Sequence, residues 1–288
     1  LLFFYIYNIF DFLLEKGMNR VMNNQPIGVF DSGLGGLNVL KELRKELPHE
    51  HFIYLGDTKR FPYGNKSSQA IIDIARDNVN FLLDQDVKMV IIACGTATSQ
   101  ALETLQKEFS VPIIGIIEPT VLNLKERIDD LDNSIGVIAT KGTIRSGVWE
   151  KKISEFIPTA EIVCHPAPLL ATMAEEGWIN NEVAEYTVKE YMKLFKRVDK
   201  LILGCTHYPL FADLMRKYLL KKTEIIDVGR ELAIYLKKKL VDMDLECNQD
   251  NVGEYKLYLT DKNEEFADMA TKIFNECISL SDIEEVEL

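Results

Sequence analysis

The feature that most constrains the fold of this chain is an internal repeat of apolar runs that open into turns of small residues. IGVFDSGLGG begins at Ile27, and the similar segment IGVIATKGT begins 108 residues later at Ile135. IIACGT ends at Thr96, and the similar segment LILGCT ends 110 residues later at Thr206. Two similarities at nearly one offset indicate two related halves.

Within each half, short apolar runs alternate with longer amphipathic stretches, which is typical of a parallel sheet with crossover helices. One such stretch has Ser67 or Ser68 as its cap and ends near Gln85. We predict an α/β fold of two pseudo-symmetric domains, each a mainly parallel sheet flanked by helices, with the active site in the cleft between them. The predicted strands cover residues 27–30, 52–55, 89–93, 113–116, 135–138, 161–164, 201–203, 224–226 and 255–259.

The repeat also sets the domain boundaries, because no linker rich in Pro, Gly or Ser separates the halves. We place the crossover near residues 117–120 and expect the chain to return to the first half after about Asp227. The expected division is 26–117 with 227–275 for the first domain, 118–226 for the second, and 276–288 for an acidic tail with a frayed end.

Residues 1–25 are expected to be an N-terminal extension. The first fourteen residues are apolar, but they are too short to span a bilayer and no basic flank precedes them. Met18 and Met22 stand just before the first convincing strand, which favours an extended or mis-called start.

Charge and cysteine content exclude several classes of protein. A formal charge of −12 over 288 residues argues against a binder of nucleic acid or of anionic membranes, because such proteins carry a basic face. An anionic substrate would need local donors such as helix N-termini. Five cysteines without a CxxC pair argue against a disulfide framework and a zinc ribbon, and fit reduced thiols in the cytoplasm.

Cys94 and Cys205 stand in matching contexts, each where a buried strand opens into a turn. A lone cysteine there is more often a small hydrophobic residue, but a matched pair favours function. Since functional residues collect at the carboxyl ends of parallel strands, facing halves would place both thiols across one cleft. A helix N-terminus would also lower the thiol pKa and favour thiolate.

Two opposed thiols suit a reaction that inverts a carbon atom, with a base on one face and an acid on the other. Disulfide exchange would need the sulfur atoms in bonding contact. A hydrolase that used Cys205 and His207 would leave Cys94 idle. A metal site formed by these three residues matches no known ligand spacing.

Two turns flank the predicted cleft. DSGLGG at 31–36 is either a structural turn or a cradle for an anion, and it lacks the spacing of a nucleotide-binding loop. Asp31 and Ser32 would stand beside Cys94 if the first and third strands are neighbours. The loop GDTKRFPYGN at 56–65 offers the Tyr63 hydroxyl beside the amide of Gly64.

Six segments in order, DSGLGGL, YLGDTKRFPYGNKS, ACGTATS, IGVIATKGTIRSGVW, APLLATMAEEGW and LILGCTHYPLF, resemble the glutamate racemase family. The resemblance implies a cytoplasmic enzyme that interconverts L- and D-glutamate without pyridoxal phosphate or metal and supplies D-glutamate for peptidoglycan. It implies a small-molecule substrate, no cofactor, no nucleic-acid or membrane partner, and a homodimer as a possible assembly.

The resemblance also implies roles for single residues. Cys94 would act on D-glutamate and Cys205 on L-glutamate, with Asp31 and His207 as their respective helpers. The implied substrate-binding residues are Ser32, Tyr63, Gly64, Thr96, Thr140, Glu175 and Thr206.

One position departs from the family pattern, since Gly95 replaces an asparagine whose amide helps to hold the substrate. Loss of a hydrogen bond to a charged group costs about 1.5–3 kcal/mol, so affinity or turnover is expected to fall by roughly one to two orders of magnitude. This departure leaves two alternatives open: an aspartate racemase, or a weakly active homologue kept as a binding protein.

Overall fold

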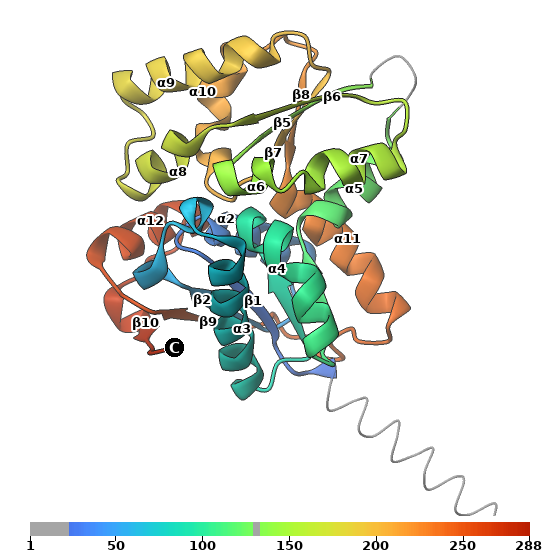
Figure 1. The fold of residues 1–288 in the computed structure, drawn as a ribbon. Coiled ribbons are helices and arrows are strands. Elements are labelled where there is room, and N and C mark those ends of the chain that lie inside the picture. Colours follow the sequence, from blue (N-terminus) through green and yellow to red (C-terminus); the bar gives the residue numbers. More distant parts are fainter. Residues whose placement is uncertain (1–22, 129–132) are drawn as a thin grey trace, which may run out of the picture.

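The structure is a computed structural model that describes residues 23–128 and 133–288, so nearly all of the expected N-terminal extension lies outside the described residues. The described chain forms two lobes, each built on a parallel sheet (Figure 1). The predicted α/β class with two parallel-sheet domains is therefore confirmed. No helix in the described ranges is long and apolar enough to cross a membrane.

The first lobe contains a six-stranded sheet in the order β10-β9-β2-β1-β3-β4. Its strands are β1 (Ile27–Asp31), β2 (Phe52–Gly56), β3 (Met89–Ile92), β4 (Ile113–Gly115), β9 (Tyr255–Leu259) and β10 (Ile283–Glu285). Its helices are α2 (Gly36–Glu46), α3 (Ser68–Asp84), α4 (Gly95–Glu108), α11 (Val228–Asp242) and α12 (Glu264–Phe274), with short 3-10 turns η1 (Thr58–Arg60), η2 (Tyr63–Asn65) and η5 (Leu280–Asp282).

The second lobe contains a four-stranded sheet in the order β6-β5-β7-β8. Its strands are β5 (Ser134–Ala139), β6 (Glu161–Pro166), β7 (Lys200–Leu203) and β8 (Glu224–Asp227). Its helices are α5 (Ile117–Lys125), α6 (Lys141–Arg145), α7 (Val148–Phe156), α8 (Pro168–Glu175), α9 (Glu182–Met192) and α10 (Ala212–Arg216), with 3-10 turns η3 (Lys193–Phe195) and η4 (Tyr208–Phe211).

Helix α3 shows how the sequence builds these layers. The Ser67 hydroxyl accepts a hydrogen bond from the Ala70 amide at 3.3 Å and so begins the helix where the sequence predicts. Its apolar stripe, which includes Ile71 and Val79, is buried. Central strands such as β1 and β3 are buried along their whole length, as expected for a parallel sheet covered on both faces.

The strand order places the functional edge of each lobe. In the first sheet β2 is added on one side of β1 and β3 on the other, and in the second sheet β6 is added on one side of β5 and β7 on the other. The switch points therefore lie between β1 and β3 and between β5 and β7. Ligands of open parallel sheets bind beyond the carboxyl ends of the strands at such switch points. The DSGLGG turn and Cys94 follow the first pair of strands, and Thr140 and Cys205 follow the second pair.

The C-terminal end differs from the expectation. The predicted frayed tail is wrong, because Ile283–Glu285 forms β10, which pairs with β9 and extends the first sheet. Ile283 is buried against the core, while the acidic residues beside it stay exposed. Burial of one apolar side chain and the pairing of a strand therefore fix a segment whose composition alone suggests disorder.

Candidate active site

The two lobes form a cavity between the carboxyl ends of their strands, and both matched cysteines line it. Nine of the eleven residues predicted for the site line this cavity, so the sequence prediction brings together one common space. They are Ser32, Tyr63, Gly64, Cys94, Thr96, Thr140, Cys205, Thr206 and His207. Asp31 and Glu175 do not line it, but they contact residues that do.

Cys94 is the N-cap residue of α4, two positions after the end of β3, and is almost completely buried. Its thiol donates to the Ser32 hydroxyl across 3.8 Å, which agrees with the expected proximity of the first and third strands. Burial, followed by the charge of Asp31, raises the pKa of the Cys94 thiol to about 12. The expected low pKa is therefore wrong for Cys94, because loss of water outweighs the start of the helix, and this sulfur is a thiol at neutral pH.

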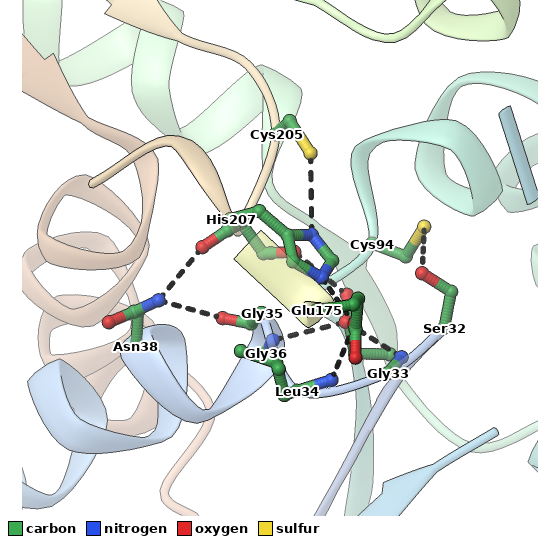
Figure 2. Close-up of polar contacts among 12 residues, drawn as sticks. Ser32, Gly33, Leu34, Gly35, Gly36, Asn38, Cys94, Glu175, Cys205 and His207 are labelled. Carbon is green, nitrogen blue, oxygen red and sulfur yellow. Dashed lines mark hydrogen bonds and ion pairs between the residues drawn. The ribbon is translucent and has the colours of Figure 1, made fainter. Parts of the chain in front are cut away.

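Cys205 of the second lobe belongs to a chain of polar contacts with His207 and Glu175 (Figure 2). Its sulfur lies 3.6 Å from His207 Nδ1, and His207 Nε2 lies 2.6 Å from Glu175 Oε1. Burial alone would lower the pKa of His207, but the hydrogen bonds to Cys205 and Glu175 and their charges hold that pKa well above its usual range. This imidazole is therefore able to take a proton from Cys205 and keep it.

The backbone amides of the DSGLGG turn bind two carboxylates of the protein, those of Asp31 and Glu175. Asp31 Oδ2 accepts from the amides of Gly33 and Gly36 at 3.1 and 3.0 Å, and Glu175 Oε1 accepts from the Leu34 amide at 3.0 Å. The turn is thus an anion cradle, as the glycines allow, but Asp31 and Glu175 fill it. It orients the two carboxylates that flank His207 and Thr206.

The Tyr63 hydroxyl differs from its expected role. It donates a short hydrogen bond to Asp57 and accepts one from Asn78 at 3.0 Å, so it points into the first lobe. Thr96, by contrast, contacts Thr140 across the lobes at 2.8 Å between hydroxyl oxygens. The threonine hydroxyls therefore remain at the cavity, and Tyr63 lines it without offering its hydroxyl.

Two residues that the sequence prediction missed also belong to this region. Lys141 is the one Lys or Arg among the cavity-lining residues, and its side chain has no hydrogen-bond or ion-pair partner within residues 23–128 and 133–288. Its place directly after Thr140 in ATKGT was the available signal. Asn38 of α2 donates to the Thr206 carbonyl at 3.0 Å, a contact over 168 positions that no local pattern predicts.

No three His, Cys, Asp or Glu side chains of the described ranges are grouped so that they could hold a metal ion. The arrangement of Cys94, Cys205 and His207 is instead one of two thiols, each with its own polar partners.

Comparison with known proteins agrees with this geometry. The Asp/Glu/hydantoin racemase model matches residues 37–234. The chain belongs to the Asp/Glu/hydantoin racemase family. Within this family, the glutamate racemase of Persephonella marina is 40% identical over 261 residues, which cover 90% of this chain and 96% of that protein.

Solved structures of the family have the same fold. The glutamate racemase isoform RacE1 of Bacillus anthracis has a TM-score of 0.86 at 32% identity and covers 92% of this chain and 98% of its own. The glutamate racemase of Francisella tularensis, solved in complex with D-glutamate, has a TM-score of 0.83 at 35% identity with the same coverage. The resemblance to glutamate racemases is therefore confirmed.

Gly95, where the resemblance implies a departure from the family pattern, lies close to the backbone that precedes Cys205. A Cβ atom placed on Gly95 would lie 2.4 Å from the carbonyl oxygen of Gly204, the residue before Cys205. The neighbour is backbone, so it cannot move aside as a side chain would. Gly95 therefore lets the segment that carries Cys94 approach the segment that carries Cys205.

Proposed function

We propose that this protein racemises glutamate by moving the α-proton between two thiols, Cys205 and Cys94. The observation that carries the proposal is that the two sulfur atoms line one cavity from different lobes. The identity of the relatives supports glutamate as the substrate, and the bound D-glutamate of the Francisella tularensis enzyme supports a site for this ligand in the shared fold.

The contacts assign different roles to Cys205 and Cys94. In the direction from L- to D-glutamate, His207 accepts the Cys205 proton, and the resulting thiolate removes the substrate α-proton. The electron pair of the broken bond stays on the substrate and spreads into its carboxylate. Cys94, which is a thiol at neutral pH, then gives its proton to the opposite face of the carbon and is left as thiolate. The reverse direction exchanges the two roles.

The charges around the cavity suggest how glutamate lies in it. Asp31 and Glu175 stand behind the Thr206 and His207 wall, where they favour the substrate ammonium group. Lys141 and the threonine hydroxyls stand elsewhere on the cavity wall and favour carboxylates. Lys141 thus supplies a positive charge for a substrate carboxylate.

The wider role follows from this activity. We propose that the enzyme works in the cytoplasm without a cofactor and supplies D-glutamate for peptidoglycan, as the resemblance implies. A homodimer remains a prediction.

The decisive experiment incubates the purified protein with L-glutamate in D₂O and follows circular dichroism together with deuterium at Cα. We expect the optical signal to decay to that of the racemate, with one deuterium entering at Cα. No optical change and no exchange would rule the activity out. A parallel incubation with L-aspartate tests the substrate, and faster turnover of aspartate would assign the protein to that amino acid instead.

A further inference from the structure

Asn38 connects the first lobe to the segment that carries Cys205 and His207. Its side-chain amide donates to the Gly35 carbonyl at 3.3 Å and to the Thr206 carbonyl at 3.0 Å (Figure 2). Gly35 belongs to the turn in front of α2, and Thr206 belongs to the second lobe. One amide group therefore joins a turn of one lobe to a loop of the other.

Thr206 is held from the first lobe at a second atom. Its hydroxyl donates to Asp31 Oδ1 at 3.2 Å, and Asp31 is fixed by the amides of its own turn. Asn38 and Asp31 thus grip the single residue that separates Cys205 from His207. A shift of Thr206 would move the proton-accepting sulfur and its imidazole together.

The chemistry of the contact requires an NH₂ group. Both partners of Asn38 are carbonyl oxygens, which only accept, and an amide nitrogen can donate one hydrogen to each. An aspartate of the same shape would bring further acceptor atoms against them. An alanine would leave the carbonyl of the buried Thr206 without this donor.

We propose that Asn38 is a positioning residue that holds the Cys205 and His207 segment in place across from Cys94. The proposal rests on the two-thiol function proposed above. It assigns to Asn38 no contact with substrate, since this residue does not line the cavity. Its effect is on the placement of one thiol, and the Cys94 side has no equivalent contact with Asn38.

The test compares Asn38→Ala and Asn38→Asp with the matched control Asn133→Ala. The Asn133 amide also donates to a carbonyl, that of Thr159, but this contact lies within the second lobe and away from the cavity. For each protein, kcat and KM for glutamate are measured, and the alkylation rates of Cys205 and Cys94 by iodoacetamide are read by mass spectrometry.

We expect Asn38→Ala to lower kcat roughly three- to tenfold, the effect of one hydrogen bond, with a smaller change in KM. Asn38→Asp should lower kcat further. In both variants the ratio of Cys205 to Cys94 alkylation should rise about threefold or more, because a loosened Cys205 loop exposes its sulfur, whereas Asn133→Ala should leave both readouts unchanged.

Two results would overturn the proposal. One is an unchanged kcat and alkylation ratio in both Asn38 variants. The other is a loss of activity with an unchanged ratio and a lowered midpoint of thermal unfolding, which would make Asn38 a purely structural residue. If the wild-type protein fails to racemise glutamate, the proposed function fails, but the alkylation ratio still reports whether Asn38 positions Cys205.

Discussion

The Cys94 side and the Cys205 side of the cavity have the same backbone plan and different surroundings. Each cysteine follows a central strand beside a switch point. Cys94 has a hydroxyl neighbour and a buried carboxylate that disfavours its thiolate, whereas Cys205 has an imidazole backed by Glu175. The comparison shows that related halves fix where the sulfur atoms lie, and that side chains from other elements give each sulfur its own polar partners.

Replacement of either thiol is expected to have the largest effect on this comparison. Cys94→Ser and Cys205→Ser should each lower inversion by about 10²- to 10⁴-fold, because a serine hydroxyl is a far weaker acid than a thiol and is almost never ionised to act as the base. The measurement is the decay of circular dichroism from pure L- and pure D-glutamate. Cys277→Ser, at an exposed cysteine away from the cavity, is the control. Full turnover in either active-site variant would break the two-thiol interpretation.

The Gly95 contact tests how closely the two sides must approach. Because a Cβ at this position meets the Gly204 backbone, Gly95→Asn should displace the Cys205 segment and lower kcat by about 10²-fold, although asparagine is the residue that the resemblance implies here. The insertion also overpacks the contact, which costs about 1–3 kcal/mol in the free energy of unfolding. Steady-state kinetics and urea unfolding measure the two effects.

A control variant separates the steric effect of a side chain at Gly95 from the general effect of replacing a glycine. Gly147 has φ +67°, so Gly147→Asn strains the backbone there, but nothing lies within 4 Å of its Cβ position and it does not line the cavity, so kcat should be unchanged. A rise in kcat in Gly95→Asn would show that the missing amide matters more than the contact, and would refute the steric interpretation of this glycine.

A substitution at Glu175 tests whether its contact with His207 makes this histidine a proton acceptor for Cys205. Glu175→Gln removes the charge that helps to raise the pKa of His207, and kcat should fall roughly ten- to hundredfold, as for loss of a hydrogen bond worth ~1.5–3 kcal/mol. Glu176→Gln changes the exposed neighbour and should have no effect. Equal kcat values for the two variants would contradict the proton-accepting role of His207.

The same pair predicts how stability depends on pH. The pKa of His207 is raised in the folded state, so its stabilisation is fully present below about pH 6.5, the ordinary histidine value, and is lost as pH rises through the folded-state pKa. The free energy of unfolding of the wild type should exceed that of Glu175→Gln most at about pH 6 and less at about pH 8.5. A difference that grows with pH would contradict the sign of the shift.

The same difference between the two sides explains how much the sequence could predict. Apolar runs and the 108- and 110-residue offsets predict the strands and the matched cysteines, because strand direction carries Cys94 and Cys205 each to the carboxyl edge of its own parallel sheet. The contact between Glu175 and His207 joins α8 to a loop 32 residues away, and only the tertiary fold creates it. The high pKa of Cys94 likewise arises from burial, which a helix N-terminus in the sequence does not reveal.

Replacement of Lys141 is expected to have the smallest effect on activity. Lys141 lines the cavity but belongs neither to the polar contacts of Cys94 nor to those of Cys205, so its effect should be the same for both thiols. Lys141→Gln removes an exposed charge, so KM for glutamate should rise about two- to fivefold with little change in kcat, equally for L- and D-glutamate. The increase should shrink as salt is added, since screening weakens an exposed ion pair. Arg145→Gln removes a charge from the same short helix away from the cavity and should leave KM unchanged. A change confined to one enantiomer would instead place Lys141 with a single thiol and end its role as a shared carboxylate partner.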